Sequence, residues 1–352
     1  MVVNIIIGVV ALSVIVLVHE LGHFFTARIT GVKIEEFGLG YPPKLFGIKR
    51  GETVYSLNAI PFGGFIKLSG EEDPSAPRSF ASKGIGVRLL ILSAGSLMNI
   101  LLPFFLLTAA FVIPHDAVVS RVVVEKVVSD SPAAMAGMRP GDEILSIDGN
   151  PVNNISDLQR YIQLNLGVEI TVLVERGESI TDEMQLVPRW KPPEGQGATG
   201  IAVRMLEVSV VKQQHSLWDA MVMGVGEFGE TFVLYKNGII SLIIGAAPAI
   251  VAGPVGIAEI TGEVARAGIS PLLEFIALIS LILGVVNLFP IPALDGGRIT
   301  FVILEWIRRG RRVSPKTEGL VHTIGFVLLI TAMLLVTYQD IVRIISGQSL
   351  MP

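Results

Sequence analysis

Four stretches of this 352-residue chain are long and apolar enough to cross a bilayer, and they limit the possible folds more than any other feature. A hydrocarbon core of about 30 Å requires roughly 20 apolar residues in a helix. Charged residues make up only 16% of the chain, a share unlike that of a soluble globular protein. The stretches are Val2 to Ala27, which contains one charged residue, and the uncharged Leu89 to Ile113, Phe275 to Leu294 and Leu320 to Gln339. We therefore expect a polytopic α-helical membrane protein with four transmembrane helices.

A fifth uncharged stretch, Asn237 to Ala258, is interrupted by Pro248, Gly253 and Pro254. These residues break helices, so we expect a re-entrant or interfacial element there and not a further span. An even number of crossings between residues 230 and 270 would leave the direction of the later spans unchanged, so that alternative stays open.

Basic residues predict the orientation. Residues 28–88 contain nine of the 27 Lys and Arg residues, and residues 298–316 contain six, so these segments should be cytoplasmic. Residues 114–274 contain 11 basic and 20 acidic residues, as expected for a large domain on the outer side. No basic residue precedes the first apolar run, so we expect a retained span and not a cleaved signal. The formal net charge of -4 argues against a nucleic-acid partner.

The outer segment contains a water-soluble module, which we place at residues 119–205. Its predicted elements are strands at 122–128, 143–147, 168–175 and 181–187, and helices beginning near Ser131 and at Ser156, the latter as N-cap. The turn motifs Pro140-Gly141-Asp142 and Ile147-Asp148-Gly149 make this module resemble a PDZ domain. Such domains bind peptides by adding a strand to a sheet edge. A small packing domain that binds nothing is the alternative.

The predicted cytoplasmic segment, residues 29–88, carries three apolar stretches rich in Gly, Pro and β-forming residues. They are Ile34 to Phe46, Thr53 to Leu57 and Phe62 to Leu68. We expect them to form hairpins against the membrane, with the glycines at turns and bulges. A plain loop with partly buried strands remains possible.

The first apolar stretch contains the motif His19-Glu20-Leu21-Gly22-His23. Histidines four residues apart share one face of a helix, which is how a helix presents two imidazoles to zinc. Zinc held by His and carboxylate ligands keeps a position open for water and activates it. Glu20 could then accept the proton of that water and pass it to the leaving amine. Three side chains that hydrogen-bond to neighbouring helices are the structural alternative.

The chain has no cysteine, so a third protein ligand must be His or a carboxylate. If the first helix runs inward, His19 and His23 lie about 12 and 6 Å from its end at Ala27. The third span also runs inward, which brings Asp295 to a similar depth. An unpaired carboxylate is costly in such an uncharged segment, so Asp295 is our predicted third ligand. The segment from Asn287 to Gly297 should break the helix and shape a cavity there.

Other side chains could take the place of Asp295. Glu35 and Glu36 follow the histidines but fall in a basic loop, and His322 begins the fourth span at the inner face. Asp295 could also serve only as the cap of the helix that follows it, next to Gly296.

Taken together, the sequence resembles the site-2 protease family of intramembrane zinc metalloproteases, in its bacterial branch, over nearly the whole chain. The resemblance rests on His19 to His23, Phe37-Gly38-Leu39-Gly40, Pro61-Phe62-Gly63-Gly64-Phe65, one PDZ-like domain, Gly253-Pro254-Val255-Gly256-Ile257 and Asn287 to Gly297. It implies one zinc ion held by His19, His23 and Asp295, with Glu20 as catalytic base. Some members of the family carry two PDZ domains, whereas this chain has room for one.

The resemblance also implies how substrate is held. The strands around residues 53–68 would pair with an unwound substrate helix, with Asn58, Gly63, Gly64 and Phe65 as contacts, and Asn287 would help to hold the substrate. Implied partners are the lipid bilayer, single-span membrane proteins such as an anti-sigma factor or remnant signal peptides, and a site-1 protease that acts upstream. The implied location is the bacterial inner membrane.

These expectations divide the chain into eight segments. They are transmembrane helix 1 with the zinc motif (1–28), the cytoplasmic β loop (29–88), helix 2 (89–113), the PDZ-like domain (119–205), a linker with an amphipathic or re-entrant segment (206–272), helix 3 with the third zinc ligand (273–297), a basic cytoplasmic loop (298–319) and helix 4 (320–342).

Two other functions compete with the protease. A membrane-anchored PDZ-type adaptor would bind peptides and leave the metal site structural or idle, yet a structural zinc site needs no base such as Glu20 beside its ligands. A zinc or proton transporter would require more ionisable residues inside the spans than this chain has.

Overall fold

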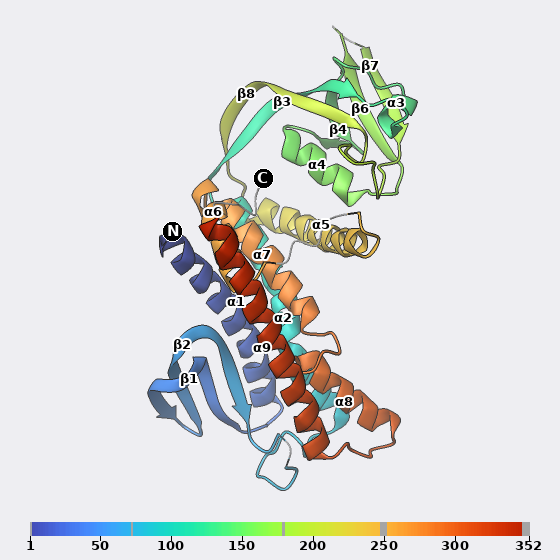
Figure 1. Ribbon diagram of the computed structural model, residues 1–352. Helices are drawn as coiled ribbons and strands as arrows, with labels where there is room; N and C mark the ends of the chain where they lie inside the picture. The colour runs from blue at the N-terminus through green and yellow to red at the C-terminus, as the bar shows by residue number, and fades with distance from the viewer. Residues whose placement is uncertain (1, 72, 178–179, 247–251, 347–352) are drawn as a thin grey trace. The chain divides into compact units, whose positions relative to one another are not determined.

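The computed structural model describes residues 2–71, 73–177, 180–246 and 252–346, and Figure 1 shows their ribbon. The chain divides into two compact units, Met1–Ala110 with Val251–Pro352, and Phe111–Ile250. Each unit contains its own cluster of buried apolar side chains.

The described part of the first unit contains six helices. They are α1 (Val2–Ile29), α2 (Ile85–Val112), α6 (Pro254–Ala267), α7 (Ile269–Val286), α8 (Asp295–Ile307) and α9 (Pro315–Ile345). Four of them, α1, α2, α7 and α9, are long and apolar enough to cross a membrane, and no other helix in the described ranges is. Their number matches the four spans expected from the sequence.

The second span begins earlier than expected. α2 starts at Ile85, four residues before Leu89, and so includes Arg88. The guanidinium of Arg88 is buried, and its Nη2 atom lies 2.8 Å from Oε2 of Glu305 on α8. In the sequence, the charge of Arg88 bounds the apolar stretch, and this ion pair neutralises that charge.

The third span ends earlier than expected. α7 stops at Val286, and residues 287–294 form an irregular loop with two prolines, which cannot continue a helix. Asp295 is the first residue of α8, so it begins a new helix and does not lie at the end of the third span. Residues 298–307, expected in a basic loop, are helical.

The helix α1 lies in close contact with α2 and α6. A Cβ atom on Gly22 would stand 2.4 Å from the carbonyl oxygen of Ala94 on α2, and one on Gly8 would stand 2.5 Å from Cα of Ala258 on α6. Glycines at such crossings let helix backbones approach closely. The turn of α1 that carries the two histidines is therefore pressed against α2.

The Gly-Pro-Val-Gly motif begins α6, where it meets a carboxylate from α9. The backbone N–H groups of Gly253 and Gly256 donate to Oδ2 of Asp340 at 2.9 and 2.8 Å. A Cβ atom on either glycine would stand 2.8 Å from a carboxylate oxygen of Asp340. The motif therefore makes room for Asp340 to cap the N-terminus of α6.

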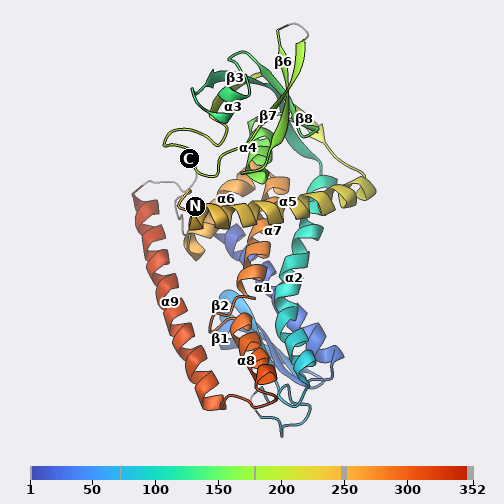
Figure 2. The same ribbon diagram turned by 90° about the vertical axis from the view of Figure 1, so that its right-hand side faces the viewer.

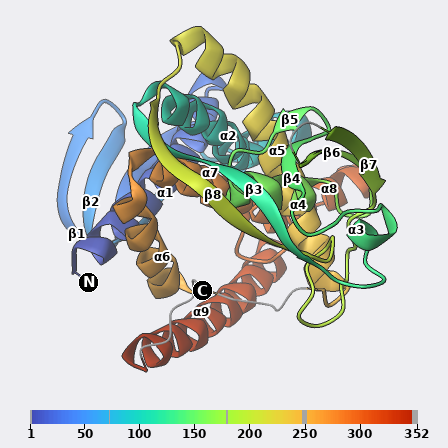
Figure 3. The same cartoon turned by 90° about the horizontal axis from the view of Figure 1, so that it is seen from above.

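Along most of its length α9 is little covered by the rest of the unit. Figures 2 and 3 show it to one side of α1, α2 and α7. Only 6% of its most apolar 18-residue window is buried, against 39% for α2. Asp340 is the one fully buried residue among the described residues of α9.

A bent antiparallel sheet follows α1. It is made of β1 (Ile34–Arg50) and β2 (Thr53–Leu68), which are longer than the three short apolar stretches expected. Residues 34–39 pair with residues 64–68 on one side and with 54–57 on the other. Among the described residues no strand pairs with the outer side of segment 64–68, which is therefore a sheet edge. Figure 3 shows both strands beside α1.

The second unit is a six-stranded sheet with three helices among its described residues. The elements are β3 (His115–Val127), α3 (Pro132–Met135), β4 (Glu143–Ile147), β5 (Asn150–Pro151), α4 (Ile155–Leu164), β6 (Ile170–Arg176), β7 (Ile180–Leu186), β8 (Ile201–Gln213) and α5 (Leu217–Ile243). The strand order is β7-β6-β4-β3-β8, with β5 paired to β4. Side chains such as Val122, Ile144, Leu158 and Val174 form its buried core.

This unit is larger than the predicted module at 119–205. β3 begins at His115 and pairs with β8 as far as Gln213, because both strands continue as a two-stranded ribbon beyond the core. Figure 1 shows this long curved ribbon. Residues 206–243, expected within a linker, are mostly strand or helix.

The N-cap of α4 is Asn154 and not Ser156, since the Asn154 side chain accepts from the N–H of Asp157 at 2.9 Å.

The helix α5 belongs to this unit through polar contacts with α4. Arg160 of α4 forms ion pairs with Glu227 and Glu230 at 2.5 and 2.8 Å. The amide of Asn237 donates to the carbonyl oxygens of Gln163 and Leu164 at the end of α4. The stretch Asn237 to Ala258 is thus divided between the end of α5 and the start of α6, and residues 247–251 lie outside the described residues.

Candidate active site

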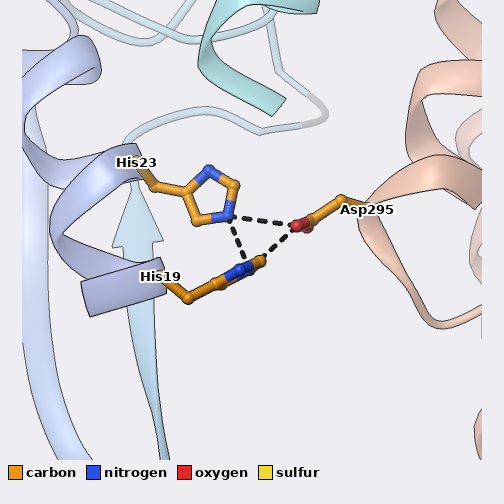
Figure 4. A group of neighbouring side chains, drawn as sticks. All are labelled: His19, His23 and Asp295. Carbon is orange, nitrogen blue, oxygen red and sulfur yellow. Dashed lines mark hydrogen bonds and ion pairs between the residues drawn. The ribbon is translucent and has the colours of Figure 1, made fainter. Parts of the chain in front are cut away.

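Two helices bring three potential metal ligands together. His19 and His23 project from α1 toward Asp295 at the start of α8, as Figure 4 shows. The Nε2 atoms of His19 and His23 lie 3.0 and 3.2 Å from Oδ2 of Asp295, and 3.1 Å from each other. These residues form the one such cluster found among the described residues, with ligand atoms within 4.8 Å of one another.

The cluster fits a zinc ion. Zinc binds imidazole nitrogen and carboxylate oxygen at about 2.0–2.2 Å, so tetrahedral ligand atoms lie roughly 3.3 Å apart. The observed separations of 3.0–3.2 Å differ from that value by a few tenths of an ångström. Two neutral imidazoles and one carboxylate are also the ligand set of zinc peptidases that leave a fourth position open.

The imidazole of His23 is oriented by the backbone of α2. Its Nδ1 atom lies 2.8 Å from the carbonyl oxygen of Ile91, which can only accept a hydrogen bond. The proton of a neutral His23 therefore sits on Nδ1, and the Nε2 lone pair faces Asp295 and His19.

Gly95, one turn further along α2, gives both imidazoles room. A Cβ atom on Gly95 would stand 2.4 Å from Nε2 of His23 and 2.7 Å from Nε2 of His19. Gly95 and Ile91 could not be found from the sequence. Both lie on an apolar helix and contribute no polar side chain, so their roles become visible only where α2 crosses α1.

Glu20 lies between the cluster and the sheet edge. It follows His19 on α1, so its side chain projects about 100° around the helix from that imidazole. A Cβ atom on Gly64 of β2 would stand 3.3 Å from Cγ of Glu20 and 3.1 Å from the carbonyl oxygen of Gly38. The open sheet edge therefore starts next to the predicted catalytic base.

The glycines of the sheet make room for aromatic rings. A Cβ atom on Gly38 would stand 2.3 Å from the ring of Phe65, and one on Gly63 would stand 2.7 Å from the ring of Tyr41. The rings of Tyr41 and Phe65 stack, with centroids 6.5 Å apart. Gly63, Gly64 and Phe65, expected to contact substrate, thus lie together at the end of the edge nearest Glu20.

The two predicted asparagine contacts lie in different settings. Asn58 is buried, and its amide donates to the carbonyl oxygens of Leu39 and Gly40 at 3.3 and 3.0 Å. Asn287 is the C-cap of α7, and its carbonyl oxygen accepts from the N–H of Gly296 at 2.7 Å. Asn58 therefore supports the fold of the sheet, and Asn287 supports the loop before Asp295.

The alternative third ligands point elsewhere. Glu35 pairs with Lys67 and Glu36 with Lys44, at 3.1 and 2.6 Å. The Lys44 ammonium holds the pKa of the Glu36 carboxyl below its usual value. His322 accepts a hydrogen bond from a backbone N–H in the loop before Asp295 and is absent from the metal cluster.

Comparisons with known proteins identify the family of the chain. Residues 7–332 match the family model described as peptidase family M50. A relative from Clostridium acetobutylicum, named as a candidate zinc metalloprotease, is 37% identical over 96% of this chain and 97% of its own length. The zinc metalloprotease RasP of Shouchella clausii is 28% identical over 95% of this chain and 97% of its own length.

Solved structures also match part of the chain, and one of them is a PDZ domain. The PDZ domain of the SdrC-like protein from Listeria monocytogenes is 25% identical and covers 23% of this chain and 85% of its own. Its TM-score of 0.21 is too low to establish a shared fold.

Proposed function

Since the chain belongs to peptidase family M50 and is an intramembrane zinc metalloprotease, we propose that it cleaves single-span membrane proteins at the cluster of His19, His23 and Asp295. The observation that carries the proposal is the convergence of three ligand atoms from α1 and α8, far apart in the chain. Such a convergence inside apolar helices is costly unless a cation balances it.

Each residue of the site has a definite role in this proposal. Zinc, when bound, polarises the scissile carbonyl and activates water. Glu20 accepts a proton from the attacking water and then donates it to the leaving amine. The carbonyl of Ile91 keeps the proton of His23 on Nδ1, so that Nε2 is free to bind the metal.

The substrate is held in an extended conformation. A transmembrane helix resists proteolysis because its backbone hydrogen bonds are internal and water is excluded, so cleavage requires local unwinding. The open edge at residues 64–68 offers backbone donors and acceptors to such a segment, as in strand addition. Its first residue, Gly64, lies next to Glu20, so an added strand would pass the catalytic base.

The predicted substrate contacts divide into two kinds. Gly63, Gly64 and Phe65 touch the added strand. Asn58 keeps the sheet in shape through its side-chain amide. Asn287, whose backbone carbonyl accepts from the N–H of Gly296, helps to hold the substrate.

The protein resides in a bacterial inner membrane, with the active site toward the cytoplasm and the PDZ-like domain outside. The excess of Lys and Arg in residues 28–88 and 298–316 supports this orientation.

The PDZ-like domain filters substrates by size and admits those that an upstream site-1 protease has trimmed, such as an anti-sigma factor or remnant signal peptides. Deletion of residues 115–243, from the first strand to the last helix of the second unit, should abolish discrimination against untrimmed substrate; unchanged discrimination would refute the filter.

Glu20→Gln tests the catalytic proposal. The full chain in liposomes is given a library of single-span peptides, and cleavage is followed by mass spectrometry together with zinc content. We expect Glu20→Gln to lose cleavage at least 100-fold with zinc retained, since a general base contributes about 10²–10⁴-fold. Glu35→Gln is the matched control and should cleave normally. Equal cleavage by wild type and Glu20→Gln would reject the role of Glu20.

A further inference from the structure

The loop of residues 287–294 fixes the position of Asp295. It folds back over the first turn of α8, where the N–H of Gly296 donates to Asn287 at 2.7 Å. A Cβ atom on Gly296 would stand 2.0 Å from the carbonyl oxygen of Phe289. The loop and the start of α8 therefore form one tight turn, so a shift of the loop moves Asp295.

One residue of this loop has an unfavourable backbone conformation. Ala293, two residues before Asp295, has φ of +77°, which is uncommon for a residue with a Cβ atom. Its N–H donates to Nδ1 of His322 on α9, at 3.0 Å. A backbone conformation of this kind persists only when surrounding contacts enforce it, and His322 supplies such a contact.

The helix α9 touches the loop in the same place through a second residue. A Cβ atom on Gly325 would stand 2.3 Å from Cβ of Pro292 and 2.9 Å from its carbonyl oxygen, so α9 lies directly on Pro292. The ring of His322 also packs against Phe301 of α8, with centroids 5.5 Å apart. The imidazole thus contacts both the loop and the helix that Asp295 begins.

We propose that His322 is a positioning residue for the third metal ligand. Its Nδ1 atom accepts the Ala293 N–H, holds the loop against α9 and thereby sets the Asp295 carboxylate beside His19 and His23. The imidazole acts through the backbone and is not a ligand, since its Nδ1 atom accepts from the Ala293 N–H and His322 is absent from the metal cluster. This inference rests on the proposed ligand set.

The role predicts a specific pattern among substitutions. His322→Leu removes the acceptor and leaves the Ala293 N–H without a partner. His322→Asn keeps it, because the Asn Oδ1 atom occupies nearly the position of His Nδ1. Gly325→Leu pushes α9 off Pro292 and leaves the imidazole intact. Thr323→Val, on the exposed side of the same turn, is the matched control.

Zinc affinity is the readout. The full chain in lipid nanodiscs is titrated with a zinc chelator, and bound zinc is measured by mass spectrometry; the thermal unfolding of the zinc-free protein is followed in parallel. We expect zinc affinity to fall about 10–100-fold in His322→Leu, the usual effect of losing a group that orients a ligand. Gly325→Leu should weaken zinc binding in the same direction, whereas His322→Asn should stay within about threefold of wild type and Thr323→Val should equal it.

Two results would overturn the positioning role. One is wild-type zinc affinity in His322→Leu, and the other is an equal loss in His322→Asn and His322→Leu, which would show that the acceptor atom is irrelevant. Asp295→Asn separates this inference from the proposed ligand set. Unchanged zinc binding in Asp295→Asn would reject the ligand set itself, whereas loss there with wild-type binding in His322→Leu would reject only the role of His322.

Discussion

Gly95 lies so close to His23 that a Cβ atom on Gly95 would stand 2.4 Å from the His23 Nε2 atom. The backbone of α2 thus forms one wall of the metal cluster, and it also supplies the carbonyl of Ile91 that orients the same imidazole. One short segment of α2 therefore decides both the space around the two histidines and the direction in which His23 points.

The first prediction follows from this contact. Gly95→Ala forces the imidazoles of His19 and His23 to move, because the new methyl group overlaps both Nε2 atoms. We expect zinc affinity to fall by at least tenfold and cleavage by about 100-fold, the usual effect of a misplacement near 1 Å. Bound zinc and cleavage rate measure the two effects.

Gly86→Ala is the matched control on the same helix. A Cβ atom on Gly86 meets nothing within 4 Å, and alanine has a higher helix propensity than glycine. The control should keep full activity and gain slightly in thermal stability. If Gly95→Ala binds zinc as tightly as Gly86→Ala, the cluster does not hold the metal in this arrangement.

A second prediction concerns the sheet edge beside Glu20. Gly64→Ala places a methyl group 3.3 Å from Cγ of Glu20 and 3.1 Å from the carbonyl oxygen of Gly38, so one of these must shift. We expect kcat to fall about tenfold with zinc content unchanged, because Glu20 is not one of the proposed metal ligands. Cleavage kinetics of Gly64→Ala and of Gly47→Ala give the comparison.

Gly47 is a suitable control because its added methyl group would meet Lys44 and Val54 only at ordinary contact distances. Equal losses in the two variants would show that the sheet responds as a whole, and would contradict a specific role for the edge next to Glu20.

A third prediction concerns the buried ion pair between Arg88 and Glu305. Glu305→Gln removes the partner of a guanidinium that is only 6% exposed. Leaving a buried charge without its partner costs about 3–5 kcal/mol, so the apparent unfolding temperature should fall sharply. The double variant Arg88→Met with Glu305→Leu should recover most of the stability, since an apolar pair often replaces a buried ion pair without loss. Failure of the double variant to recover would mean that packing, and not charge, is the main contribution at this contact.

A fourth prediction concerns the PDZ-like domain. Burial raises the pKa of the Asp142 carboxyl, but two hydrogen bonds from Arg176 at 2.8 Å and one from the Arg139 N–H outweigh it, and the net pKa is lowered. A lowered folded-state pKa stabilises the domain above the unfolded pKa of about 3.9, and this contribution is lost as the pH falls through the folded value.

Asp142→Asn should therefore lower the free energy of unfolding at pH 7, with little difference from wild type well below the folded pKa. Hydrogen exchange of residues 111–250 as a function of pH is the measurement. A constant difference between the two proteins from pH 7 to pH 2 would contradict the assignment.

The sequence singled out His19, His23 and Asp295, which the structure brings together, and Glu20, whose role stays a prediction. His19, Glu20 and His23 stand out because ionisable groups are rare in an apolar helix, and Asp295 because a carboxylate in an uncharged segment needs a partner. The family assignment confirms the zinc protease over the adaptor and the transporter.

The sequence did not predict features that depend on partners distant along the chain. The predicted start of α2 was too late, because the partner that neutralises Arg88 lies on α8. The segment of α5 was assigned to a linker, because the partner of its Glu227 and Glu230 is Arg160 on α4, which the sequence does not place beside them. Asn154 and not Ser156 caps α4. Both residue types cap helices, and they lie two positions apart, so the sequence could not distinguish them. Gly95 gave no signal, because a glycine reveals a close approach only when the opposing atoms are known.

The weak coverage of α9 determines how this enzyme should be handled. Only 6% of the most apolar 18 residues of α9 is buried against the rest of the protein. In a membrane, the sides of this helix would therefore contact mainly lipid chains. His322 and Gly325 lie on that helix, so under the proposed role of His322 we expect the amphiphile chosen for solubilisation to affect the position of Asp295. We therefore expect metal content measured in a micelle to differ from that measured in a bilayer of native thickness.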